Sequence, residues 1–395
     1  TSTGADTWTC PAGVTEVEVL IVAGGGAGGS GSDSAGAGAG GIVHDEDYAV
    51  TAGVVYDLSV GAGGATVNYT VGGDGSDSVW NVNAEGSGIT MTADGGGGGG
   101  ASGAATYGRD GGSGGGNGGY NGVHDPGQAT QSSPTGAVGY GNDGGINPAP
   151  NGTNYYLYPG GGGGAGAVGN NGNDPTNHAG KGGVGKLFST FVAYGTDSSN
   201  VASTGSNGGY FGGGGGGAGG GNDDLYGYAG VGGGGIGGQY AGGSPTAPAS
   251  AIANTGGGGG GSSHNTGRTG GDGGEGVVLI RSRPYGFNDM TLISTATTAQ
   301  SVPTKGDLVM TYTDGIGTAT INTDIKAYVS RDDGSNYTQG TLASQGTTGG
   351  HTILTFHDLD ISGQPSGTTM RYKIETLNQD TDKATRIQAV SLGWS

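Results

Sequence analysis

Short apolar runs near the two ends of the first 283 residues predict β-strands there. Residues 15–23 read TEVEVLIVA, and β-branched side chains alternate with polar ones at the start of this run. A period of two is typical of a strand with one buried face. Two more strands are expected within residues 41–60, joined by a turn at residues 51–53. Shorter strands are predicted at residues 78–82, 89–93 and 276–282.

The last 112 residues show the same kind of pattern at closer intervals. Apolar and β-branched runs are separated by turn residues at spacings of roughly 8–12, which is typical of a β-sandwich. No convincing helical period is present. Strands are predicted at residues 308–313, 318–322, 325–330, 351–356, 370–376 and 387–392.

Glycine dominates the chain between residues 94 and 274. Of the 103 glycines, 91 lie in residues 1–283 and 12 in residues 284–395, so the composition divides the chain into two domains with these bounds. Isolated glycine runs are typical of flexible linkers. Packed side by side as polyglycine II helices, with three residues per turn, they can instead exchange backbone hydrogen bonds with their neighbours. We expect the second arrangement, with a core made of backbone. The runs are residues 95–100, 160–164, 212–217, 232–235 and 256–261.

Composition and charge exclude several classes of protein. Hydrophobic residues make up 31% of the chain, too few for an ordinary enzyme domain around an aliphatic core. The net charge of -19 argues against nucleic-acid binding through a basic face. The single cysteine, Cys10, cannot form an internal disulfide and is expected to be a buried small side chain. No apolar stretch reaches the ~18 residues of a membrane span, so no membrane insertion is expected.

Residues 8–15 (WTCPAGVT) and 17–26 (VEVLIVAGGG) resemble the opening of the glycine-rich domain of bacteriophage tail-fibre and adhesin proteins. The closing match is GGDGGEGVVLIRS at residues 270–282, with intermediate matches at 40–43, 56–64 and 90–100. The resemblance covers residues 1–283. It implies a β-sandwich with inserted polyglycine II helices, similar to the glycine-rich extracellular domain of anaplastic lymphoma kinase.

The second domain has a resemblance of its own. Residues 290–302, 370–378 and 390–394 are similar to a small β-domain at the end of phage structural proteins, especially those of aquatic phages. The fold class expected for the whole chain is therefore all-β: residues 1–283 form a β-sandwich with a polyglycine II bundle, and residues 284–395 form a second β-sandwich.

Motifs that suggest catalysis or cofactors are incomplete. Residues 180–186 fit the G-x-x-x-x-G-K phosphate loop, but Leu187 stands where Mg²⁺ needs Ser or Thr, and no strand precedes the loop. The six histidines are scattered and interpreted as surface residues. Asp pairs at 223–224 and 332–333 lack the spacing of a Ca²⁺ loop. We therefore expect no enzyme activity, no cofactor and no metal, although a structural cation remains an open alternative.

A turn and a group of aromatic residues are the remaining candidates. Ser330, Asp332, Gly334 and Tyr337 have the spacing of an Asp-box hairpin, a structural turn. Tyrosine among Ser, Gly and Asn is typical of recognition loops, because it offers contact area at low entropic cost. The alternative is that the rings cover the ends of the glycine bundle. The receptor-contact candidates are Tyr155, Tyr156, Tyr158, Tyr210, Phe211, Tyr226, Tyr228 and Tyr240.

These patterns together suggest a structural protein at a virion surface, and so an extracellular location. We expect a phage tail-fibre or adhesin-like appendage that recognises a host-surface glycan or protein with its glycine-rich loops. Its partners would include other virion proteins and copies of itself, as a trimer or a fibril. The alternative is a purely architectural subunit of a capsid decoration or an extracellular fibril.

Overall fold

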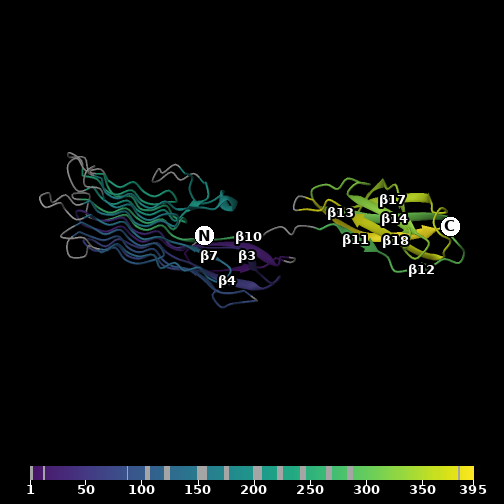
Figure 1. The fold of residues 1–395 in the computed structure, drawn as a ribbon, viewed down its shortest axis with the longest axis horizontal. Helices are drawn as coiled ribbons and strands as arrows, with labels where there is room; N and C mark the ends of the chain where they lie inside the picture. The colour runs from purple at the N-terminus through teal and green to yellow at the C-terminus, as the bar shows by residue number, and fades with distance from the viewer. Residues whose placement is uncertain are drawn as a thin grey trace. The chain divides into compact units, whose positions relative to one another are not determined.

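The computed structural model describes residues 3–11, 14–86, 88–102, 107–119, 125–148, 158–172, 178–198, 207–219, 226–240, 246–263, 269–282, 288–380 and 383–395. The chain divides into two compact units, Thr1–Arg283 (unit 1) and Pro284–Ser395 (unit 2) (Figure 1). Both are built from antiparallel strands, and the only helical turn in the described ranges is η2 (Ser189–Phe191). The all-β fold predicted from the sequence is confirmed.

Unit 1 contains two four-stranded sheets with a shared core. The core includes Val19 from one sheet and Tyr56 and Trp80 from the other. The first sheet has the order β1 (Gly4–Thr9), β4 (Val55–Val60), β5 (Ser78–Trp80) and β6 (Met91–Ala93). The second has the order β10 (Val277–Ser282), β2 (Glu16–Val22), β3 (Ile42–Ala49) and β7 (Val138–Tyr140). The strands expected within residues 41–60 and at the end of the domain are present as β3, β4 and β10.

Strand β2 is buried on both faces, which explains its nearly continuous apolar sequence. Val17, Val19 and Ile21 belong to the core between the sheets. Leu20 and Val22 belong to a second core on the opposite face. Two short paired strands, β8 (Lys186–Leu187) and β9 (Tyr210–Phe211), lie beside this core. Phe211 of β9, Phe191 of η2 and Phe188, which lies between β8 and η2, complete it.

The glycine-rich segments form a bundle in which backbone hydrogen bonds repeat every three residues. Successive N–H groups of residues 24–30 donate to three neighbouring segments in turn, so groups three positions apart donate to the same segment. The acceptor segments are residues 70–76, 271–274 and 35–38. Their carbonyl groups accept hydrogen bonds from further segments, at residues 64, 96–99 and 259–262. Three residues per turn point successive peptide groups in three directions. The predicted polyglycine II helices are therefore present, with neighbours on all sides.

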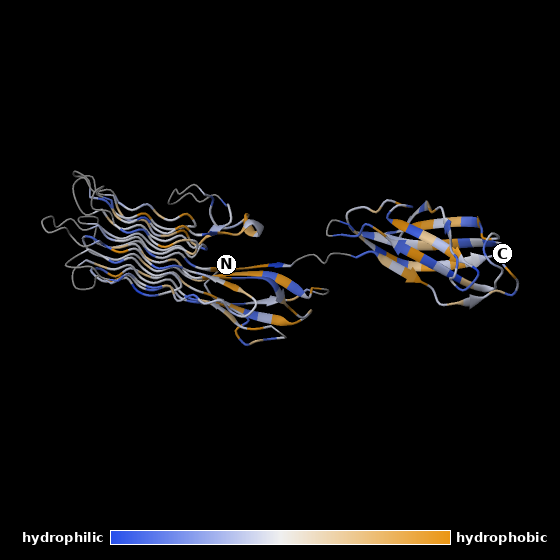
Figure 2. Cartoon of the chain, in the orientation of Figure 1, coloured by the Kyte–Doolittle hydropathy of each residue, from blue (hydrophilic) through white to orange (hydrophobic). Residues whose placement is uncertain are grey.

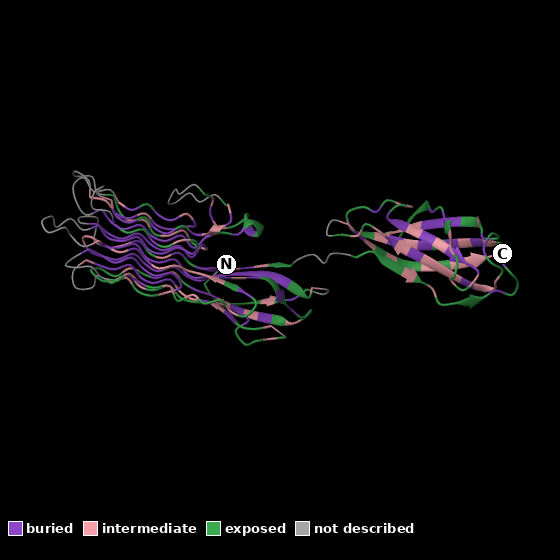
Figure 3. Cartoon of the chain, in the orientation of Figure 1, coloured by how far each residue is buried: buried purple, intermediate pink, exposed green. Residues whose placement is uncertain are grey.

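Burial separates interior segments of this bundle from those on its outside. All of residues 160–164, 212–218 and 256–262 are buried, and Figure 3 shows these long uninterrupted buried stretches. Figure 2 shows that the bundle is mostly pale, so residue hydropathy does not distinguish the inside of the bundle from its outside. A Cβ atom on an interior residue such as Gly215 would overlap a backbone carbonyl of the next segment. Glycine is therefore required at such positions, while alanine occupies other interior positions, among them Ala27 and Ala37.

Unit 2 is a sandwich of two antiparallel sheets around one core, to which Leu308 and Ile325 contribute from opposite sheets. One sheet contains β11 (Met290–Ile293), β18 (Thr369–Thr376), β14 (Ile325–Ser330) and β15 (Thr338–Gly340), with β12 (Thr297–Thr298) paired to β18. The other contains β16 (Ala343–Thr348), β17 (His351–Asp360), β13 (Lys305–Ile316) and β19 (Ala384–Trp394).

One predicted strand of unit 2 is wrong. Residues 318–322 form no strand beyond a single bridge from Ile321 to Ile325. Asn322 has a positive φ of 64°, and the Asp324 carboxylate accepts a hydrogen bond from the Thr320 N–H at 2.8 Å. These local contacts turn the chain, and they override the β-branched composition of the segment.

Candidate functional site

Of the eight aromatic residues expected to contact a receptor, the structure describes six, and two of these six are buried. Tyr155 and Tyr156 lie outside the described residues. Tyr158 is 2% exposed and Phe211 is fully buried, so the expectation that these two rings are exposed contact residues is wrong. Phe211 is buried because it packs beside Leu20 in the second core of unit 1.

The remaining four candidates lie at the surface. Tyr210, Tyr226 and Tyr240 are half-buried, and Tyr228 is 49% exposed. The rings of Tyr226 and Tyr228 are tilted against one another with centroids 5.4 Å apart. Tyr228 is therefore the candidate that presents the most ring surface, and it belongs to a groove.

This groove, which we call the rim groove, lies on the outside of the glycine bundle. It has a volume of about 410 Å³. Three neighbouring segments, here called the rim segments, form it: residues 166–170, 180–185 and 227–231. Its lining is mainly small and apolar, with one cation and one aromatic ring, and consists of Ala167, Val168, Asn170, Lys181, Gly182, Val184, Tyr228, Ala229 and Val231.

Lys181 lies beside the aromatic ring in this groove. Its Nζ atom is 5.5 Å from the centroid of the Tyr228 ring, within the range of a cation–π interaction. Lys181 also lies within residues 180–186, which fit the phosphate-loop pattern, but backbone N–H groups there are already hydrogen-bonded. Gly182, Gly183 and Gly185 donate their N–H groups to carbonyls of neighbouring segments. The amides that would cradle a phosphate are thus already bonded, because they hold the bundle together.

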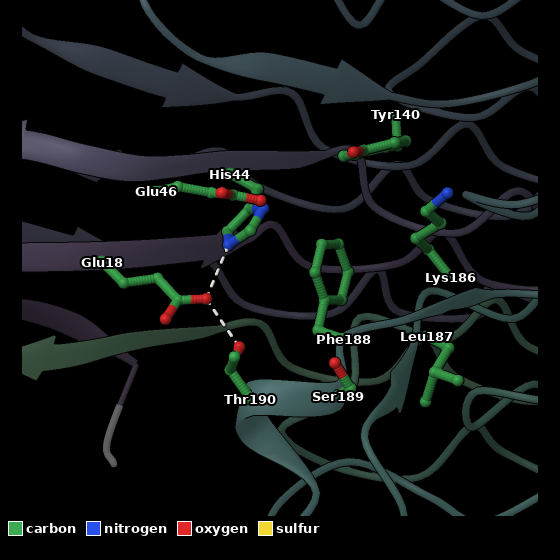
Figure 4. A pocket seen from close by; sticks show the side chains of 9 residues that line it. All are labelled: Glu18, His44, Glu46, Tyr140, Lys186, Leu187, Phe188, Ser189 and Thr190. Atoms are coloured by element: carbon green, nitrogen blue, oxygen red, sulfur yellow. Dashed lines mark hydrogen bonds and ion pairs between the residues drawn. The ribbon is translucent and has the colours of Figure 1, made fainter. Parts of the chain in front are cut away.

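A second group of polar side chains was not anticipated from the sequence. Glu18 is 1% exposed although it carries a carboxylate. Its Oε1 atom lies 2.9 Å from His44 Nε2 and accepts a hydrogen bond from the Thr190 hydroxyl at 2.6 Å (Figure 4). Arg281 contacts the other oxygen through Nε at 2.7 Å and Nη2 at 2.6 Å. Burial alone would raise the pKa of Glu18, but the hydrogen bonds from Thr190, His44 and Arg281 outweigh it, so this pKa lies below its usual range.

The cluster borders a small polar pocket of about 270 Å³, whose lining includes Glu46, Tyr140 and Lys186 (Figure 4). Here the expectation that the histidines are surface residues is wrong for His44, whose side chain is 10% exposed and packs edge-on against Phe188. Within the described residues, no hydroxyl or thiol group bonds to the imidazole. The cluster therefore links β2, β3 and β10 to the η2 turn through the side chains of Glu18, His44, Arg281 and Thr190.

The Asp-box residues lie in the hairpin between β14 and β15. The Ser330 hydroxyl donates to Asp332 Oδ1 at 2.8 Å and accepts from the Gly334 N–H at 2.9 Å. Burial would raise the pKa of Asp332, but hydrogen bonds from Asn336 and Ser330 lower it below its usual range. Gly334 has a φ of 84°, and a Cβ at this position would lie only 2.8 Å from the Tyr337 hydroxyl. Each position of the motif thus has a structural task in the turn.

Two further features are metal-ligand clusters and membrane-spanning helices. Among the described residues, no group of three or more His, Cys, Asp or Glu side chains could hold a metal ion. Asp223 and Asp224 lie outside the described residues. Cys10 is buried, as expected, and burial raises the pKa of its thiol. Within the described part of the chain, no helix has the length and apolar character needed to cross a bilayer.

Comparison with known proteins agrees with this architecture. A family model described as a glycine-rich domain matches residues 1–283, which is the extent of unit 1. No curated protein matches the chain. The match covers well over half of the 395 residues and includes the sandwich, the bundle and the rim groove. The chain therefore belongs to the glycine-rich domain family.

Proposed function

We propose that the protein is a surface appendage of a phage virion, of tail-fibre or adhesin type, that attaches to a host-surface glycan or protein. One observation carries this proposal. The interior of the bundle is backbone, so the side chains that can recognise a ligand are confined to its turns and its rim. A scaffold that displays variable side chains on a rigid frame suits recognition. The resemblance of residues 1–283 to tail-fibre domains supports the same role.

The proposed mechanism is multivalent attachment. Single shallow sites such as the rim groove bind weakly, and copies held together in a homo-oligomer raise the overall affinity without new contacts. Unit 1 carries a net charge of -15, which disfavours attachment through nucleic acid.

Adsorption to cells tests the proposal. Fluorescently labelled full-length protein is incubated with a panel of Gram-negative and Gram-positive bacteria, and the bound fraction is measured. We expect saturable binding to some strains and a loss of at least half of it when Tyr155 and Tyr156 are both changed to Ala. Tyr194→Ala is the matched control, since Tyr194 is 54% exposed and lies outside both pockets. Absence of saturable binding to every strain contradicts an adhesive role.

The alternative function is architectural, in a capsid decoration or an extracellular fibril. It is favoured by the same feature, because a backbone-bonded bundle is stiff. Light scattering and negative-stain electron microscopy of the full chain separate the two functions. Open head-to-tail polymers support a fibril subunit, whereas discrete closed oligomers that adsorb to cells support an adhesin.

A further inference from the structure

Backbone hydrogen bonds between the rim segments place residues that are distant in the sequence side by side across the groove. The Asn170 N–H donates to the Lys181 carbonyl at 2.9 Å, and the Gly182 N–H donates to the Tyr228 carbonyl at 2.9 Å. These two bonds align Asn170, Lys181 and Tyr228 in one row. The row therefore contains an amide, an ammonium group and an aromatic ring.

A second row lies one helical turn further along the same segments. The Ala167 N–H donates to the Val184 carbonyl at 3.1 Å, and the Gly185 N–H donates to the Val231 carbonyl at 2.7 Å. Three residues of polyglycine II helix rise about 9 Å, which is the separation of the rows. The second row contains only apolar side chains. The groove thus has a polar end and an apolar end.

The side chains of the first row are accessible. Asn170 and Lys181 are exposed, and about half of the Tyr228 surface is in solvent. Between Lys181 and Val184, which is also exposed, the two glycines are buried. Every third residue therefore points outward, and the outward positions carry the side chains that line the groove.

Among the residues that the structure describes, no carboxylate compensates the charge of Lys181. Arg109 pairs with Asp74 at 2.9 Å and Arg281 pairs with Glu18 at 2.6 Å, so these two basic groups of unit 1 are neutralised. Within the described residues, Lys181 pairs with no carboxylate, and none of the residues that line the rim groove is acidic. A cation in a groove whose described lining contains no acid, within a unit of net charge -15, is a local point of attraction for an anion.

We propose that the rim groove binds a carboxylate-bearing sugar residue of a surface polysaccharide. The sugar carboxylate pairs with the Lys181 ammonium, the apolar face of the pyranose stacks on Tyr228, and the Asn170 amide bonds a ring hydroxyl. The apolar row at Val184 and Val231 contacts the neighbouring sugar. This inference deepens the proposed function, on which it rests, by naming the ligand class and a site on the flank of the bundle.

The chemistry of the row favours an acidic sugar over the other anions and over neutral glycans. A phosphate would need several donors, and the backbone amides beside Lys181 are already bonded within the bundle. A neutral sugar would use the ring and the amide and leave the ammonium without a partner. A uronic acid uses all three groups of the row, and its contact with lysine is a charge-assisted hydrogen bond.

Calorimetric titration of the full chain tests the assignment. The probes are a tetramer of galacturonate and a neutral galactose tetramer, at ~0.15 M salt, where a Debye length of about 8 Å screens the long-range repulsion by the acidic surface. We expect saturable binding of the acidic tetramer only. Tyr228→Ala and Lys181→Gln each weaken it by roughly tenfold or more, while Lys181→Arg retains most of the affinity. Tyr194→Ala serves as the matched control, and unchanged melting temperatures verify that the variants are folded.

The possible outcomes separate this inference from the broader function. Equal binding of both tetramers, no binding of the acidic tetramer, or unchanged binding by Lys181→Gln overturns the acidic-sugar site. If the site fails in this way while cells still adsorb wild-type protein, the adhesive function stands and its contact lies elsewhere. If the tetramer binds as expected but no cell adsorbs the protein, the site stands and the proposed attachment role fails.

Discussion

Substitution of Gly162 by alanine tests whether backbone packing holds the bundle together. Gly162 lies in a fully buried run, and a Cβ there would overlap the Ala37 carbonyl. That carbonyl accepts a hydrogen bond from the Gly215 N–H at 2.9 Å, and Gly162 donates to the Gly215 carbonyl at 2.9 Å. The backbone of Gly162 lies outside the left-handed region, so alanine adopts its conformation without strain. The substitution therefore isolates the steric effect.

The expected loss follows from the contacts that must move. Two buried hydrogen bonds between segments weaken, each worth about 1 kcal/mol net, and overpacking adds about 1–3 kcal/mol. Replacement of glycine stabilises by about 0.4–1 kcal/mol through the unfolded chain, which offsets only part of this loss. We expect Gly162→Ala to lower the free energy of unfolding of unit 1 by about 2–4 kcal/mol.

Hydrogen exchange followed by mass spectrometry after pepsin digestion measures this effect segment by segment in the full chain. Amides in residues 158–172 and 212–219 should exchange faster in the variant. Gly363→Ala is the matched control, because Gly363 is exposed, has no positive φ and has no heavy atom within 4 Å of a built Cβ. It should leave exchange in unit 1 unchanged. A Gly162→Ala protein that is as protected as wild type, or more so, would refute the packing argument.

Three further predictions concern polar groups. Glu18→Gln should destabilise unit 1 by about 2–3 kcal/mol, because it breaks the bonds to Arg281 and His44, whereas the exposed Glu16→Gln should have little effect. Because the folded pKa of Glu18 lies below 4.5, the stability that its carboxylate contributes to unit 1 is present above pH 4.5 and is lost on acidification. Melting curves from pH 7 to pH 3 should show this loss in wild type and not in Glu18→Gln. Ser330→Ala should cost unit 2 about 1–2 kcal/mol in denaturant unfolding, with the exposed Ser335→Ala as control. Hydrogen bonds from Lys383, Asn378 and the Thr320 N–H lower the pKa of Asp324 from 3.8 to about 2. Unit 2 should therefore lose stability as the pH falls from 3.8 to about 2, and Asp324→Asn should lose less. An equal loss in both proteins contradicts a stabilising role of the Asp324 carboxylate.

The sequence predicts those parts of the fold that depend on local pattern. Strands β3, β4 and β10 follow from their β-branched runs, and the polyglycine II helices follow from steric freedom that only glycine has. Strand β1 is not predicted, because its sequence GADTWT lacks an apolar alternation and the strand is mostly exposed. It is held by pairing with β4, which lies more than 40 residues later in the chain.

The candidate sites depend on contacts that no local pattern records. Glu18 alternates with apolar neighbours in β2, so its side chain is expected on the solvent face of the strand. Residues 188–191 cover that face of β2. Thr190, which donates a hydrogen bond to Glu18, is 172 residues away in the sequence. Likewise, Lys181 and Tyr228 become neighbours only through the register of two glycine segments. The signal that the sequence does contain is a period of three, with side-chain-bearing residues at 181 and 184 separated by glycine pairs.

This period explains how one scaffold can combine a core of backbone with side chains displayed on its outside. Ordering glycine costs more backbone entropy than ordering any other residue, and in the interior that cost is offset by hydrogen bonds and Cα–H···O contacts between segments. Those interactions use no side chains. On a rim segment, exposed side chains such as those of Lys181 and Val184 lie outside this packing. On the proposed function, ligand specificity could change at every third rim position without a change in the packing of the bundle, which is the physical reason for proposing recognition there.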